Sequence, residues 1–153
     1  DFVKSAQLAY AISSLKPLVA KNLNSAYYNL GVTAMNSNDF ETAIFYLSKT
    51  DDSSALKIAY RNGAVYYLKQ NNFEKASYYA GLSCDSEIIK TVKKNELVYR
   101  YNQLAKKASG VKTLADAKKY KSTYQEMLRL AQQIGDSGLA SGVEETLRKL
   151  QGS

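Results

Sequence analysis

The amino-acid sequence repeats itself with a period of 33 residues, and this repeat restricts the possible folds more than any other feature. Between positions 26 and 53, 11 of 28 residues are identical to the residue 33 positions later, where chance would give roughly two. The identical positions in the first copy are Ala26, Tyr27, Asn29, Val32, Asn38, Phe40, Glu41, Ala43, Tyr46, Asp52 and Ser53. Because a period of this length is typical of a repeated supersecondary unit, the chain is expected to stack similar units side by side.

The spacing within each copy predicts two helices joined by a short polar turn. In the first copy, apolar residues recur at helical spacing on both sides of the break at 36–39. Asp39 is placed to cap the second helix, and Asn72 takes the same position in the second copy. Asp52 and Asp85 precede the next helix in each copy and are expected to cap it. The repeat therefore predicts an all-α chain of helix hairpins.

Two segments of the first copy resemble the helix–turn–helix signature of the tetratricopeptide repeat family. These are 26–31 (Ala-Tyr-Tyr-Asn-Leu-Gly) and 38–44 (Asn-Asp-Phe-Glu-Thr-Ala-Ile). The second copy keeps the pattern, with Ala64 in place of the glycine, Gly63 in place of the usual leucine and Ala80 where a large residue is usual. Both copies lack the proline that commonly closes such a repeat, and the period is one residue short of the family's. The resemblance implies a right-handed α-α superhelix, a solenoid of antiparallel helix hairpins.

Small residues recur where the helices of each hairpin should touch. Gly31 and Ala64 lie on the first helices, and Ala43 and Ala76 on the second helices. Residues of this size let two helix axes approach closely, with aromatic side chains filling the space beside them. The pattern thus predicts tightly packed hairpins.

The flanking segments are expected to add helices to these two copies, because a repeat stack generally needs at least about three units to cover its apolar faces. We expect a single domain over residues 1–153 with about seven helices. Its parts are a preceding helix or half repeat (1–23), repeat one (24–53), repeat two (54–86), a long third hairpin (87–135) and a capping helix (136–151).

Local signals set the outer boundaries. Pro17 is expected to interrupt or restart the first helix, because proline lacks the backbone N–H and disfavours helical geometry in the residue before it. One long helix is expected from Thr113 to a stop at Gly135. The segment 141–144 has the spacing of a capping box for a final helix. The apolar side of that helix would be Val143, Leu147 and Leu150.

The composition argues against catalysis and against a bound metal or cofactor. The chain has no histidine, which removes imidazole ligands and the usual bases of nucleophilic catalysis. Cys84 is the single cysteine, so neither an internal disulfide nor a thiolate metal site is available. No apolar run approaches the length of a membrane span. We expect a soluble, non-enzymatic protein without cofactors, either cytoplasmic or a soluble part of a bacterial cell-envelope protein.

The family resemblance implies that the first helix of each unit lines a concave groove, which often binds a segment of a partner protein. The residues at the matching positions are Tyr28, Asn29, Val32, Met35 and Asn36 in the first unit, and Arg61, Asn62, Val65, Leu68 and Lys69 in the second. The carboxamides of Asn29 and Asn62 could pair with a peptide backbone whatever its sequence, and Asn95 follows at the same spacing. Alternatively, these asparagines hydrate the surface or brace the next helix. The leading hypothesis is a scaffold that binds a peptide segment of another protein.

A second hypothesis follows from the distribution of charge. The net charge is +7, and residues 87–121 alone contribute +7, from nine lysines and Arg100 against three acids. The basic face would be formed by Lys93, Arg100, Lys107, Lys118 and Lys121. Such a face could bind an acidic protein, an anionic surface or nucleic acid, although a solvated helical face explains most charge runs and the chain has no nucleic-acid-binding motif. Association between copies through an uncapped edge is a further alternative.

Overall fold

The computed structural model describes residues 2–111 and 113–151, and within them it contains eight helices and no strand. The helices are α1 (Phe2–Asn36), α2 (Phe40–Leu47), α3 (Ser53–Lys69), α4 (Phe73–Ser83), α5 (Ser86–Ala108), α6 (Leu114–Lys119), α7 (Lys121–Ile134) and α8 (Ser137–Gln151). The predicted all-α fold class is therefore confirmed.

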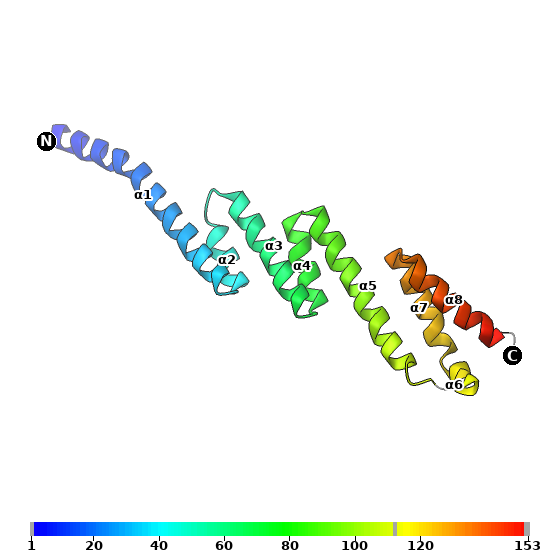
Figure 1. Cartoon of the computed structure of the whole chain (residues 1–153). Helices are drawn as coiled ribbons and strands as arrows, with labels where there is room; N and C mark the ends of the chain where they lie inside the picture. Colours follow the sequence, from blue (N-terminus) through cyan, green and yellow to red (C-terminus); the bar gives the residue numbers. More distant parts are fainter. Residues whose placement is uncertain (1, 112, 152–153) are drawn as a thin grey trace.

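The helices form an elongated row of hairpins (Figure 1). Helices α1 and α2 make the first hairpin and α3 and α4 the second, and α2 packs against α3 as α4 packs against α5. Beyond α5, α7 and α8 pack against each other, and α7 contacts α5. The amino-terminal half of α1 projects from the end of the row (Figure 1).

The turn inside each hairpin is built in the same way in both copies. The backbone N–H of Thr42 donates to the side chain of Asp39, and that of Lys75 donates to the side chain of Asn72, each at 3.1 Å. Just before these caps, Asn38 (φ 60°) and Asn71 (φ 56°) take the left-handed conformation, which asparagine tolerates better than most residues. The predicted caps are thus confirmed.

The turn between hairpins repeats just as closely. The carboxylate of Asp52 accepts from the backbone N–H groups two and three residues later at 2.9 and 3.0 Å, and Asp85 does the same at 3.0 and 3.3 Å. The N–H of each aspartate donates to the hydroxyl two residues before it, Thr50 or Ser83, at 3.3 and 3.2 Å. Three matching contacts at one sequence offset show that the repeat is structural as well as sequential.

Small residues do bring the helices of each hairpin together. A Cβ atom added at Gly31 would lie 2.5 Å from Cγ of Leu47 and 3.2 Å from the carbonyl oxygen of Ala43. One added at Gly63 would lie 3.0 Å from the Tyr79 ring. Ala43 is itself 0% exposed. The hairpins are therefore packed too closely for larger side chains at these positions.

The aromatic residues that open α2 and α4 have related but unequal surroundings. Phe40 meets Tyr66 with ring centroids 5.4 Å apart at 52°, and Phe73 meets Tyr99 at 5.3 Å and 52°. Phe40 is buried, because Tyr67 also covers it at 6.4 Å. Phe73 is only half-buried, since the residue 33 positions after Tyr67 is Arg100.

Two expectations about helix boundaries near the ends of the chain are wrong. Pro17 lies inside α1, which runs unbroken through residues 2–36, so the proline does not interrupt or restart the helix. The proline removes one helical hydrogen bond, to the carbonyl of Ser13, on a surface exposed to solvent that can replace the donor. The capping box expected at 141–144 does not form: α8 begins at Ser137, close to the expected bounds 136–151, and the hydroxyl of Ser141 donates within the helix to the Ser137 carbonyl. The Asp136 carboxylate caps it by accepting from the N–H of Leu139 at 3.0 Å.

The helix expected over 113–135 is divided in two, which raises the number of helices from about seven to eight. Its predicted ends are right: Thr113 caps α6, and Gly135 (φ 79°) ends α7. At Tyr120 the backbone N–H donates three residues back to the carbonyl of Ala117, and the direction changes. The break lets α6 contact α8 and buries Ala117.

The apolar side of α8 is as predicted. Val143 and Leu150 are buried, and Leu147 packs against the cluster that joins α5, α7 and α8. This cluster also contains Tyr101, Met127 and Leu130. It closes the carboxyl-terminal end of the row.

Candidate functional site: two equivalent pockets along the row

Two open pockets lie where consecutive units meet, and each is lined by eight residues. The first pocket is lined by Met35, Asn36, Asn38, Phe40, Asn62, Val65, Tyr66 and Lys69. The second is lined by Leu68, Lys69, Asn71, Phe73, Asn95, Val98, Tyr99 and Asn102. Every residue of the second lining lies 33 positions after its counterpart in the first. The two pockets are therefore copies of one site.

Each pocket is positioned by three elements. The first lies between the end of α1, the start of α2 and the middle of α3, and the second lies between the same parts of α3, α4 and α5. The left-handed Asn38 and Asn71 hold one edge, because their conformation lets the chain turn directly into the capped helix that follows. The pocket volumes are about 240 Å³ and 440 Å³. The second is larger, and its phenylalanine is the less covered of the two.

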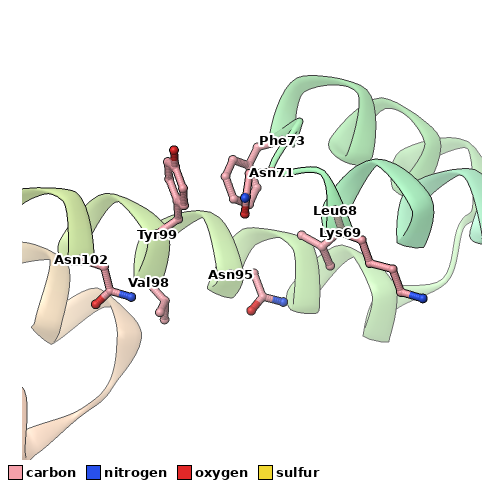
Figure 2. A pocket seen from close by; sticks show the side chains of 8 residues that line it. All are labelled: Leu68, Lys69, Asn71, Phe73, Asn95, Val98, Tyr99 and Asn102. Atoms are coloured by element: carbon pink, nitrogen blue, oxygen red, sulfur yellow. The ribbon is translucent and has the colours of Figure 1, made fainter.

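The two linings share the same chemistry. Four positions are apolar or aromatic in both: Met35 or Leu68, Phe40 or Phe73, Val65 or Val98, and Tyr66 or Tyr99. The other positions carry carboxamides or the ammonium of Lys69, which lines both pockets. Neither lining contains a carboxylate. Figure 2 shows the second pocket, with Asn95 and Asn102 presented from α5 on either side of Val98.

The asparagines of α3 and α5 differ in their partners. The side-chain NH₂ of Asn62 donates to the sulfur of Met35 at 3.4 Å, which ties α3 to α1. In the second pocket Leu68 replaces the methionine and offers no acceptor. Asn95 makes no side-chain hydrogen bond to another residue in the described part of the chain. A carboxamide both donates and accepts, so each pocket presents a polar group beside an apolar wall.

The structure brings together six of the ten residues predicted to line the groove. Met35, Asn36, Asn62, Val65 and Lys69 line the first pocket, and Leu68 joins Lys69 in the second.

The other four predicted groove residues lie outside both pockets. Tyr28, Asn29 and Val32 lie earlier along α1, where no preceding hairpin completes a pocket within the described residues. Arg61 forms an ion pair with Asp85 at 3.5 Å and lines a different depression, beside Cys84.

Several pocket residues were not among those predicted from the sequence. They are Asn38, Phe40, Tyr66, Asn71, Phe73, Val98, Tyr99 and Asn102. A signal for part of this set was present, because Asn62, Val65 and Tyr66 recur as Asn95, Val98 and Tyr99. These three identities mark a third copy of the first-helix pattern on α5, where the second pocket lies.

The predicted basic face is exposed but partly balanced by acids. Lys93, Arg100, Lys107, Lys118 and Lys121 are all exposed. The guanidinium of Arg100 lies 3.4 Å from the carboxylate of Glu126 on α7. Neighbouring pairs join Lys90 to Glu87 at 3.2 Å and Lys119 to Asp116 at 4.0 Å. Exposed pairs of this kind contribute little to stability, but they lower the net field of this face.

The described residues contain neither a metal-ligand cluster nor a helix that could span a membrane. No family model, curated protein or solved structure matches the chain. The pair of pockets is therefore identified by the repetition within the chain itself.

Proposed function

We propose that this protein is a non-catalytic scaffold with a tetratricopeptide-like, right-handed solenoid that binds a segment of another protein along its two equivalent pockets. The observation that carries the proposal is the recurrence of the same eight-residue lining one repeat later. A surface that repeats at a fixed step suits a ligand that is itself a polymer, because successive side chains of a peptide can occupy successive pockets.

The composition of the linings supports a peptide in an extended or helical conformation. The partly exposed apolar and aromatic positions, Val65 and Tyr66 in one pocket and Phe73 and Val98 in the other, can bury aliphatic or aromatic side chains. The carboxamides of Asn62 and Asn95 can exchange hydrogen bonds with a peptide backbone regardless of its sequence. This division gives affinity through burial and orientation through the amides.

The test uses peptides selected from a displayed random library against the unmodified protein, with affinities measured by calorimetry. The double variant Asn62→Ala with Asn95→Ala should lose about 5- to 100-fold in affinity, because each lost hydrogen bond contributes about 0.5–1.5 kcal/mol. Asn29→Ala is the matched control, since Asn29 is an exposed asparagine on α1 outside both pockets. It should leave the affinity unchanged.

Two results would contradict the proposal. Equal affinity for the double variant and the unmodified protein would remove the pockets from the binding surface. A steep fall in affinity with rising salt, together with loss of binding on replacing Lys93 and Lys107, would assign binding to the basic face instead. Binding in the pockets should depend only weakly on salt, because most of its energy comes from apolar burial.

A further inference from the structure

A straight apolar stripe on α1 is left uncovered. It consists of Leu8, Ile12, Leu15, Val19, Leu23, Ala26 and Leu30. Its six large side chains are each between 46% and 64% exposed. The steps between these residues are 4, 3, 4, 4, 3 and 4, a pattern of 11 residues that keeps side chains on one face of a helix. Monomeric proteins rarely expose so continuous an apolar surface.

The repeat shows what kind of element covers this face elsewhere in the molecule. The residues 33 positions after Leu23, Ala26 and Leu30 are Leu56, Ala59 and Gly63 on α3. Ala59 and Leu56 pack against Leu47 of α2, and Gly63 approaches Phe40. On α5 the equivalent of Ala59 is Val92, which is buried in the cluster shared with α4. In both later units, a helix lies on the face that α1 leaves open.

We propose that α1 of a second copy covers this stripe, in an antiparallel dimer whose two-fold axis passes beside Val19. The positions of the stripe are symmetric about Val19: Leu8 would face Leu30, Ile12 would face Ala26, and Leu15 would face Leu23. A two-fold axis requires this self-complementarity.

The lysines of α1 are spread more evenly along the seam in the antiparallel arrangement than in the parallel one. Helix α1 carries lysines but no acidic residue. In a parallel, in-register pair each lysine would lie level with its own copy, which is unfavourable. In the antiparallel pair, Lys4, Lys16 and Lys21 fall level with Ala34, Asn22 and Pro17. The exact matching of each lysine with its own copy is thereby avoided, and Lys16 of one copy lies one residue from the level of Lys21 of the other.

The area suits a modest but specific dimer. Half-exposed aliphatic side chains offer roughly 100 Å² each, so the stripe would bury about 1,200 Å² in total, at the lower end of the range for stable interfaces. The stripe lies on a different side of α1 from Met35 and Asn36, which line the first pocket. Dimerisation and peptide binding are therefore separate properties and can fail separately.

Sedimentation equilibrium of the full chain over a concentration series tests the dimer. We expect the average mass to rise from the monomer toward the dimer. Val19→Glu should hold the protein at the monomer mass, because it places two carboxylates together at the axis. Ser14→Glu is the matched control, since it adds the same charge to an exposed position of α1 away from the stripe, and it should dimerise as before. Circular dichroism should show the same helix content in both variants.

Cysteine cross-linking tests the geometry. In a Cys84→Ser background, which removes the single native thiol, Val19→Cys should form a disulfide-linked dimer under mild oxidation, whereas Ile12→Cys should not. Cross-linking through Ile12→Cys would indicate a parallel pair and overturn the proposed axis. A monomer mass at every concentration up to high micromolar, or equal dimerisation by Val19→Glu, would overturn the dimer itself.

Discussion

Replacing Gly31 with alanine tests the packing that makes the first hairpin possible. The new Cβ atom would lie 2.5 Å from Cγ and 2.8 Å from Cδ2 of Leu47, which is 1% exposed and cannot move outward. Overpacking of a core costs about 1–3 kcal/mol, and alanine in a helix recovers about 1 kcal/mol relative to glycine. The expected net loss in the free energy of unfolding is therefore about 0–2 kcal/mol.

The second copy suggests how to reverse that loss. The residues 33 positions after Gly31 and Leu47 are Ala64 and Ala80, which are 0% and 1% exposed. The second copy therefore makes the same contact with two alanines, where the first copy has a glycine and a leucine. Leu47→Ala alone should cost about 2–5 kcal/mol. In that background Gly31→Ala should become stabilising, because it fills part of the cavity and favours the helix.

Thermal and urea unfolding of the four proteins in this cycle measure the coupling between the two positions. For a chain of this length about 1 kcal/mol corresponds to a shift of about 2–4 °C in Tm, so the change of sign is measurable. If Gly31→Ala had the same effect in both backgrounds, the side chain of Leu47 would not be what excludes a larger residue. The close approach of α1 and α2 would then be refuted.

Two further predictions concern the buried part of the repeat. Ala43→Leu should lower the stability by about 1–3 kcal/mol, because Ala43 is fully buried between the helices; an unchanged thermal midpoint would contradict the packing of α1 on α2. Burial, with smaller contributions from Tyr67 and Glu41, raises the pKa of Tyr79 to about 12. As the pH rises, the Tyr79 phenol therefore loses its proton at a lower pH in the unfolded chain than in the folded chain. The stability contributed by the neutral phenol is lost as the pH rises from about 10 to about 12. Tyr79→Phe should flatten the fall in stability over that pH range, and an identical alkaline profile would show that another group is responsible.

The sequence was most informative where it repeats. The caps at Asp39, Asn72, Asp52 and Asp85 were predictable because capping depends on local hydrogen bonds that a side chain makes within three residues. Gly31 was predictable as a contact point because only a small residue allows that approach. These features need no knowledge of distant parts of the chain.

The features that sequence analysis missed depend on tertiary contacts. Pro17 was expected to end a helix, but α1 continues because the helical residues on both sides outweigh one lost hydrogen bond. The break at Tyr120 has no glycine or proline to mark it, and it follows from the packing of α6 on α8.

The candidate site was predictable only in part. Arg61 was assigned to the groove by its position in the repeat, yet it pairs with Asp85 and lines a different depression beside Cys84. Phe40 and Phe73 were recognised as packing residues, and their contribution to the pockets appears only when neighbouring units are assembled.

The two equivalent pockets lie one repeat apart and share Lys69. This interval would determine how a peptide bound in them is aligned. Under the proposed function, a peptide with a single anchoring side chain would find two nearly degenerate registers, which would add about 0.4 kcal/mol of statistical affinity but leave its position ambiguous. A peptide with two anchors, separated by the distance of one unit, has a unique alignment. The protein would then discriminate among peptides more by the spacing between their two anchoring side chains than by the identity of either side chain.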